Sequence, residues 1–162
     1  MFLLRYVALL ALVVWVGGLI ALGAIAAPAT FEVMAARQVA DGRLLAGAVF
    51  GEILRRFFWT SSAAAGVILV SLALRRILGP KPRHFGWRAG TLALMVAASV
   101  YSGVVITNRI ATLQKSIGVA PSSLPESDPR RVEFGRLHMT STALQLVPLL
   151  GGLALIFWEL RE

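Results

Sequence analysis

Four long apolar runs constrain this chain more than any other feature of its sequence. Each run is about 17–22 residues long and contains no Asp, Glu, Lys or Arg. That is the length that an α-helix needs to cross a hydrocarbon layer of roughly 30 Å. Inside lipid, a lone apolar run can pair its backbone N–H and C=O groups only as a helix. The sequence therefore predicts an all-α integral membrane four-helix bundle, with spans at Tyr6–Ala27, Phe57–Leu74, Gly90–Ile106 and Met139–Trp158.

Length and composition fit a single domain. The chain has 162 residues, and four spans with their connections use nearly all of them. Hydrophobic residues make up 57% of the chain, above the roughly 45–50% of soluble proteins. We therefore expect residues 1–162 to form one transmembrane domain. The chain contains no cysteine, which excludes disulfides, thiolate metal ligands and cysteine nucleophiles.

The first run has two interpretations. Arg5, the apolar stretch after it and the segment Ala24-Ile25-Ala26 fit a cleavable signal peptide. However, the run is about 22 residues long, whereas the core of a signal peptide has 7–15. Trp15 and the pair Gly17-Gly18 also suit helix packing. We favour a retained transmembrane helix and keep cleavage as the alternative.

The strong positive charge is explained by the membrane. The net charge is +8, from 16 Lys and Arg against 8 Asp and Glu. The basic residues lie at the ends of the apolar runs, where they meet anionic lipid headgroups and control topology. No basic stripe with interleaved aromatic residues occurs outside the spans, so we expect no nucleic-acid partner. The expected partners are membrane lipids and either other membrane subunits or further copies of this chain.

The connection at Arg75–Ala89 predicts the orientation. It contains five basic residues and no acid. By the positive-inside rule this short loop is cytoplasmic, which places both termini in the cytoplasm. By raw count the two long connections together hold nine Lys and Arg, against seven in the short loop and the two termini. This count favours the opposite orientation. We favour cytoplasmic termini, in a bacterial inner (plasma) membrane.

The long connection after the first span contains helical patterns of its own. Pro28 is expected to end the first span, because proline lacks the N–H group that a helix interior requires. Thr30 is then expected to cap a new helix, and Asp41-Gly42 to break it. A second amphipathic stretch from Leu44 runs directly into the second span.

The other long connection combines helix and loop. Apolar residues continue at helical spacing from the third span to Ile117. Residues 118–129 are rich in Pro and Ser and predict an irregular loop. Asp128-Pro129 is a good N-cap and first-turn pair, so the last helix should begin there and project beyond the membrane before Met139. The sequence thus predicts short amphipathic helical segments that form a cap on the side of the long connections.

Polar residues gather at the membrane boundary on that same side. His138, Ser141 and Gln145 share one face of the last span, and Asn108 and Arg109 fall at the same boundary. Ionisable groups at membrane depth are costly and are functional candidates by default. The alternative is structural, because such side chains also hydrogen-bond between transmembrane helices. The candidate polar cluster comprises Asn108, Arg109, His138, Ser141, Gln145, Glu52 and Glu133.

Small residues and one proline predict features of helix packing. Gly and other small residues four positions apart let helix backbones approach closely. Pro148 lies within the last span and removes one backbone hydrogen bond, which predicts a kink. The small-residue pairs are Gly17 and Ala21, Gly47 and Gly51, Ser62 and Gly66, and Ser99 and Gly103.

Cofactors and catalysis find little support in the sequence. His84 and His138 are assigned to opposite sides of the membrane, so haem is left with His138 and either Met34 or Met139. A closed zinc site cannot be assembled without cysteine and with two histidines. There is no Ser nucleophile motif, no H-E-x-x-H and no pair of intramembrane aspartates. We expect no cofactor, no metal site, no catalytic residues and no enzyme activity.

Three segments contain short motifs that also occur, in the same order, in a known family: Trp15–Phe31, Ala46–Phe57 and Phe134–Ser141. They resemble the family of four-span proteins similar to transmembrane protein 205, largely a domain of unknown function. Its eukaryotic relatives are linked to resistance to platinum drugs, so the resemblance implies metal or drug handling and no enzyme activity. Gln145 stands where the resemblance leads us to expect Asn. The family-like positions are Trp15, Gly18, Pro28, Phe31, Gly47, Gly51, Arg56, Phe57, His138 and Ser141.

Two classes of function follow. The first is a non-catalytic membrane protein that acts as a structural or accessory subunit of a membrane assembly, indicated by the packing residues. The alternative is a small transporter or exporter of metal ions or amphipathic drugs, indicated by the polar face, Pro148 and the resemblance. Four spans are few for a complete transport path, so this alternative requires an oligomer.

Overall fold

The computed structural model describes residues 2–37, 41–79 and 83–161, and this part of the chain contains helices and no strand. Four helices are each long and apolar enough to cross a membrane: Phe2–Ala36, Gly42–Leu78, Phe85–Ile117 and Pro129–Leu160. The prediction of an all-α membrane bundle is confirmed. The elements are α1 (Phe2–Ala21), η1 (Leu22–Ala26), α2 (Ala27–Ala36), α3 (Gly42–Leu78), α4 (Phe85–Val100), η2 (Tyr101–Ile106), α5 (Thr107–Ile117), η3 (Pro121–Ser123) and α6 (Pro129–Leu160).

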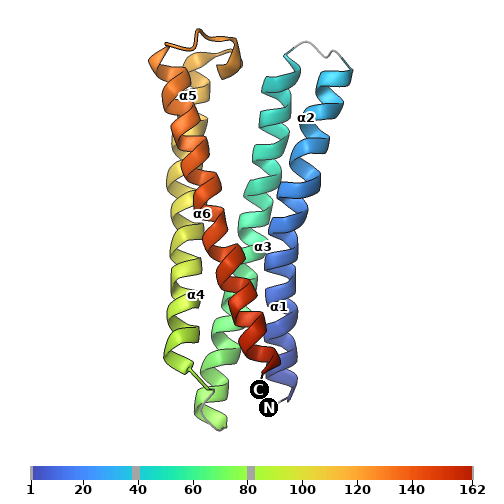
Figure 1. Ribbon diagram of the computed structural model, residues 1–162, viewed down its shortest axis with the longest axis vertical. Helices are drawn as coiled ribbons and strands as arrows, with labels where there is room; N and C mark the ends of the chain where they lie inside the picture. The colour runs from blue at the N-terminus through green and yellow to red at the C-terminus, as the bar shows by residue number, and fades with distance from the viewer. Residues whose placement is uncertain (1, 38–40, 80–82, 162) are drawn as a thin grey trace.

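The helices form two antiparallel hairpins (Figure 1). In the first hairpin α3 packs against α1 and α2, and in the second α6 packs against α4 and α5. The hairpins meet where α1 packs on α6 and α3 on α4. Both chain ends and the short α3–α4 connection lie at one end of the bundle, which we call the terminal end. At the opposite, distal end, which carries the two long connections, the hairpins stand apart.

The core lies where all four long helices meet. Leu12, Trp15 and Met95 are almost completely buried there, together with Ile68 and Leu155. Glycines bring the backbones close: a Cβ added at Gly151 would lie 2.8 Å from Met95 Cγ, too near for an unaltered structure. In the core these side chains contact one another instead of lipid. Such close packing is the main attraction between helices in a membrane.

The small residues that make close contacts differ in part from those predicted. Gly18 lies against the ring of Phe57, and Gly103 lies against the ring of Phe58. In contrast, a Cβ added at Gly17 or Gly66 would meet nothing within 4 Å. Neighbouring residues on a helix face directions about 100° apart, so the sequence indicates that small residues pack but not which of them.

Pro28 does not end the first helix, contrary to our prediction. Residues 22–26 form a π-helical turn in which the Ala27 N–H donates to the Leu22 carbonyl, five residues earlier. This wider turn carries the helix past the missing N–H of Pro28 and on to Ala36. Thr30 is correspondingly no N-cap, because its hydroxyl donates back to the Ala26 carbonyl at 2.6 Å.

A second π-helical turn, η2, interrupts the third long helix. The backbone N–H and the hydroxyl of Thr107 both donate to the Ser102 carbonyl, the hydroxyl at 3.0 Å. Ser102 itself is buried. The helix then continues as α5 to Ile117, as the apolar spacing predicts, and Gly118 ends it in a left-handed conformation with φ 72°.

The last helix begins where the sequence predicts. The Asp128 carboxylate accepts the backbone N–H of Arg130 at 2.8 Å, and α6 runs unbroken from Pro129 through Pro148 to Leu160. The loop before it is irregular apart from the single 3-10 turn at Pro121–Ser123. The helical extensions at the distal end, together with this loop, form the predicted cap.

Replacing Asp128 by Ala should lower the thermal unfolding midpoint more than replacing it by Asn or Ser, which retain an N-cap acceptor. The Arg130 side chain and N–H groups lower the pKa of Asp128 below its ordinary value of 3.8. Its charged form therefore stabilises the fold above that pH, and the contribution is lost as the pH falls through the lowered pKa. Circular dichroism melts at pH 7 and pH 3 measure this. Equal midpoints for the wild type and Asp128→Ala at pH 7 would contradict it.

Candidate functional site

Three ionisable side chains are buried at the terminal end of the bundle. Arg75 lies in the last turn of α3, Arg88 in the first turn of α4 and Glu159 in the last turn of α6. Their exposed fractions are 5%, 3% and 9%. Each of the three residues lies within two positions of the end of an apolar run. Buried charge at this depth is costly, so the geometry of its partners decides what the group does.

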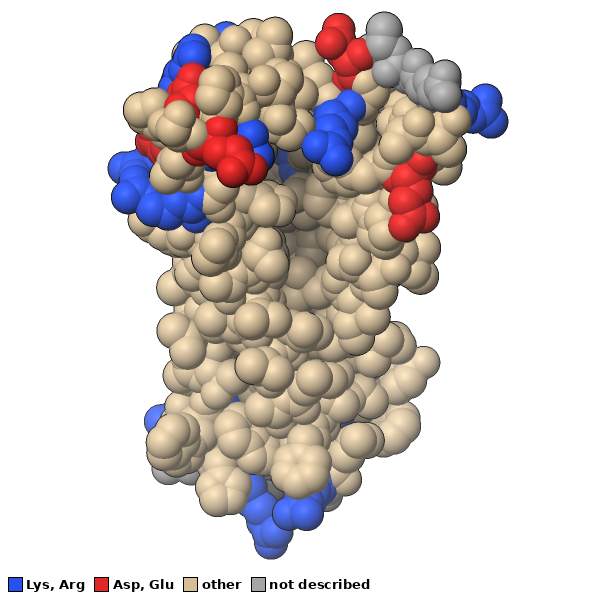
Figure 2. Space-filling model, turned by 45° about the horizontal axis from the view of Figure 1, so that its top comes forward, with Lys and Arg blue, Asp and Glu red and all other residues tan. Residues whose placement is uncertain are grey.

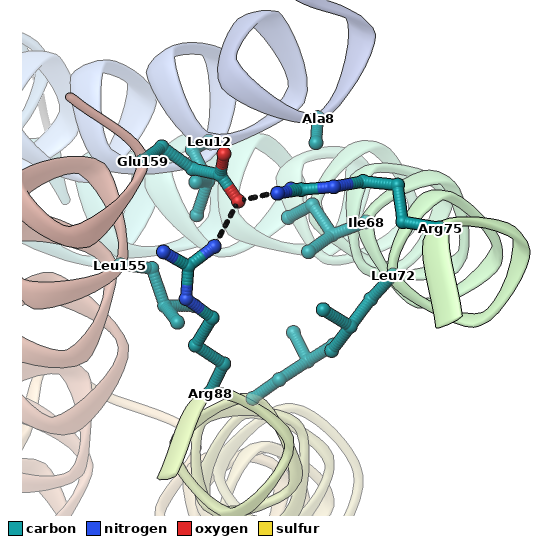
Figure 3. A pocket seen from close by; sticks show the side chains of 9 residues that line it. Ala8, Leu12, Ile68, Leu72, Arg75, Arg88, Leu155 and Glu159 are labelled. Carbon is teal, nitrogen blue, oxygen red and sulfur yellow. Dashed lines mark hydrogen bonds and ion pairs between the residues drawn. The ribbon is translucent and has the colours of Figure 1, made fainter. Parts of the chain in front are cut away.

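The carboxylate of Glu159 is the centre of this group (Figure 3). Its Oε1 accepts hydrogen bonds from Arg75 Nη1 at 2.6 Å and from Arg88 Nη1 at 2.7 Å. Arg5 of α1 lies on its other side, with Nε 3.6 Å from Oε2. We call Arg5, Arg75, Arg88 and Glu159 the ionic cluster. It joins one residue from each of the four membrane-spanning helices.

The same arginines cap the end of α6. The last carbonyls of a helix have no partner within the helix, and they carry partial negative charge. Arg5 Nη2 donates to the Glu159 carbonyl at 2.6 Å, and Arg88 Nη2 donates to the Trp158 carbonyl at 2.8 Å. A carboxylate at a helix C-terminus is ordinarily unfavourable, and the surrounding guanidinium groups compensate for it here.

The ionic cluster connects the two hairpins. Arg5 and Arg75 belong to the first hairpin, whereas Arg88 and Glu159 belong to the second. Beside it lies a cavity of about 20 Å³, lined otherwise by apolar side chains such as Leu12, Ile68 and Leu72. That volume holds about one water molecule. The arrangement suits a structural link between helices, and the cavity is too small for a substrate.

The residues of the candidate polar cluster lie at the distal end but are not joined there. Asn108, Arg109, Glu133 and His138 are exposed. Among the described residues, no hydrogen bond or ion pair connects them to one another or to Glu52. The backbones of the hairpins diverge toward this end, and Glu52 pairs with arginines of its own helix.

These residues find local partners instead. Glu52 binds Arg55 at 2.7 Å and Arg56 at 2.8 Å on its own helix. The His138 ring stacks on the ring of Phe134, one turn earlier in α6, with centroids 6.3 Å apart. From the predicted set, Ser141 reaches another helix, because its Oγ lies 3.0 Å from Ser102 Oγ. Gln145 is half-buried on α6.

Some of the family-like positions in the first hairpin make packing contacts and others do not. Trp15 is in the core, and Gly18 lies against Phe57. Phe31 packs edge-on against Phe50, with ring centroids 6.4 Å apart. Of the other positions, Gly47 lies near Gln114, Arg56 pairs with Glu52, Pro28 is exposed, and a Cβ at Gly51 would meet open space.

Sequence reasoning missed the ionic cluster, although a signal for it exists. Arg75, Arg88 and Glu159 directly flank three apolar runs, and an even number of spans places those three ends on one side. The loop at 75–89 is basic and contains no acid, so its charge is complementary to that of Glu159 at the same end. From the sequence, the loop predicts orientation alone, and the candidate polar cluster is expected at the other end.

The search for metal ligands gives a limited result for the described part of the chain. Across residues 2–37, 41–79 and 83–161, no three His, Asp or Glu side chains are grouped so as to hold a metal ion. His84 precedes α4 at the terminal end, whereas His138 lies on the distal half of α6. The expectation that the protein binds no cofactor stays a prediction.

Together, these observations define a four-helix integral membrane protein whose hairpins are tied by a buried ionic cluster. The profile of a family described as a domain of unknown function (DUF4149) matches residues 10–118. The match covers more than half of the chain, so the protein belongs to this family. It includes Arg75 and Arg88 and ends before Glu159. Comparison with curated proteins and with solved structures found no match.

Replacing Glu159 by Gln should lower the free energy of unfolding by about 3–5 kcal/mol, because two buried guanidinium groups would lose their counter-charge. Glu133→Gln is the matched control, since Glu133 is an exposed acid near the other end of the same helix. Arg75→Gln should recover part of that loss once Glu159 is replaced, because it removes one of the two buried charges that have lost their partner. Denaturant unfolding in a mild detergent measures all three. Similar effects of Glu159→Gln and Glu133→Gln would refute the assignment.

Proposed function

We propose that this protein is a non-catalytic subunit, structural or accessory, of an assembly in the bacterial inner membrane. The observation that carries the proposal is a pair of small-residue faces turned outward from the bundle. Gly17 and Ala21 on α1, and Ser62 and Gly66 on α3, are all exposed. A Cβ added at Gly17 or Gly66 would meet nothing within 4 Å.

Such faces are binding surfaces for helices in a membrane. Lipid tails are as apolar as leucine, so transmembrane helices associate through close packing and interhelical hydrogen bonds rather than through the hydrophobic effect. Close packing within this protein uses other glycines, among them Gly18, Gly103 and Gly151. The outward small faces thus have no packing role within the described bundle and suit a helix from another chain.

The chemistry of the buried groups also favours a non-catalytic role. The ionic cluster ties four helices and adjoins a space of about 20 Å³, which is too small for a substrate. Four residues of the candidate polar cluster are exposed and are not joined to one another: Asn108, Arg109, Glu133 and His138. These features fit a scaffold whose surface, rather than an internal site, performs its function.

Replacing Gly66 or Gly17 by Leu should weaken assembly by about tenfold or more while leaving the fold intact, because the added side chain projects into open space. Gly135→Leu is the matched control: a Cβ there also meets nothing within 4 Å, and Gly135 lies outside the apolar runs. Native mass in a mild detergent measures assembly. An unchanged assembly in both the Gly17 and the Gly66 variants would count against the proposal.

We further propose that both termini face the cytoplasm. The acid-free basic loop supports this orientation, and the loop lies at the same end as both termini. Single cysteines are clean probes because the chain has none. In intact cells an impermeant thiol reagent should label Ser122→Cys and spare Arg83→Cys. Labelling of position 83 without position 122 would show that the termini face the opposite side of the membrane.

A transporter or exporter remains the second candidate. It is favoured by the surface at the distal end, which is hollowed between the two hairpins (Figure 2). The ionic cluster joins the hairpins at the other end. The resemblance to proteins similar to transmembrane protein 205 fits metal ions or amphipathic drugs as cargo. Native mass separates the candidates: a stable complex with other chains supports the accessory subunit, and a symmetric homodimer with bound ions supports the transporter.

A further inference from the structure

A second cavity lies at the terminal end, between the start of α4 and the end of α6. It is open to the surface, has a volume of about 240 Å³ and is lined by Arg83, His84, Arg88, Phe157, Trp158 and Arg161. Three of these six residues are arginines and none is acidic. We call it the basic pocket. It shares Arg88 with the ionic cluster but is about ten times larger than the cavity beside Glu159.

The start of α4 adds to the positive character of the basic pocket. His84 precedes the helix in a left-handed conformation with φ 55°, and no side chain of the described residues caps the helix. The N-terminus of a helix carries partial positive charge and N–H groups without intrahelical partners. Gly86 lies in this first turn, and a Cβ there would meet nothing within 4 Å, so the backbone is open to close approach.

The basic pocket lies at the depth of lipid headgroups. Arg88 precedes the third apolar run by two residues, and Trp158 is the last residue of the fourth. Tryptophan is enriched at this interface, where its ring contacts both acyl chains and headgroups. Arg161 lies over the Phe157 ring, with the guanidinium carbon 4.3 Å from the ring centroid, which holds its charge at the rim of the pocket.

We infer that the basic pocket binds the phosphate group of an anion, as presented by the headgroup of an anionic phospholipid or by free phosphate. Guanidinium groups match phosphate in geometry and bind it with paired, charge-assisted hydrogen bonds. Basic pockets between transmembrane helices are known sites for phosphorylated lipid headgroups. The volume is below the roughly 300–1,000 Å³ of sites for drug-sized molecules, which suits a headgroup.

The test uses the full chain in a neutral detergent, titrated separately with short-chain phosphatidylglycerol, the matched phosphatidylcholine and inorganic phosphate. Arg161→Gln removes a charge and His84→Asn removes an imidazole from the basic pocket without touching the ionic cluster, and Asn tolerates the left-handed conformation. Arg76→Gln is the matched control: Arg76 is at the same end and also lies over a ring, that of Phe85 at 4.6 Å, but it does not line the pocket.

The wild type should bind phosphatidylglycerol at least tenfold more tightly than phosphatidylcholine. Arg161→Gln should weaken that binding about fivefold, whereas Arg76→Gln leaves it unchanged. Binding of phosphatidylglycerol without phosphate identifies the lipid as the source, and competition between the two identifies a site for either anion. Equal binding of both lipids, or equal losses in the Arg161 and Arg76 variants, would overturn the inference. Melting curves without ligand confirm folding, and His84→Asn serves if Arg161→Gln does not fold.

Discussion

The buried carboxylate of Glu159 is the interaction on which the arrangement of the helices depends. A carboxylate or a guanidinium group alone at this depth would be strongly destabilising, so each of the buried charges requires the others. Because the partners come from α1, α3 and α4, satisfying Glu159 of α6 fixes the relative positions of all four spans. Apolar packing in lipid is only weakly directional, and the ionic cluster supplies the missing specificity at the terminal end.

Two adjacent aromatic residues extend that order toward the middle of the bundle. Phe57 and Phe58 follow one another on α3 and face different neighbours. Phe57 lies against Gly18 of α1, within the first hairpin, and Phe58 lies against Gly103 of η2, in the second. Beyond this level the backbones of the hairpins diverge, although Gln114 of α5 still lies near Gly47 of α3, where an added Cβ would be 3.6 Å from Gln114 Nε2. The ionic cluster thus holds the terminal end, whereas among the described residues no ion pair joins the hairpins at the distal end.

Much of the fold could be predicted from the sequence, because the signals are local. The length of an apolar run predicts a span, and the pair Asp128-Pro129 predicts the start of α6 without reference to the rest of the chain. The ionic cluster could not be predicted in the same way, because it depends on which helix ends meet. The prediction that Pro28 ends the first helix is wrong for a related reason: a π-helical turn accommodates the proline, and its hydrogen bonds leave no mark in the sequence.

The π-helical turn η2 has a consequence for how such a protein can evolve. A turn of this kind holds one more residue than an ordinary helical turn, and deleting a single residue there would restore regular α-helix. Each residue of a regular α-helix advances the chain by about 100°, so a deletion in such a helix would rotate everything after it by that angle. One deletion within Tyr101–Ile106 would instead be absorbed by the wide turn and would leave α5 facing nearly as before, with Arg88 and the terminal end in place. This turn is therefore a place where the third long helix can lose one residue while both the distal surface and the ionic cluster are inherited intact.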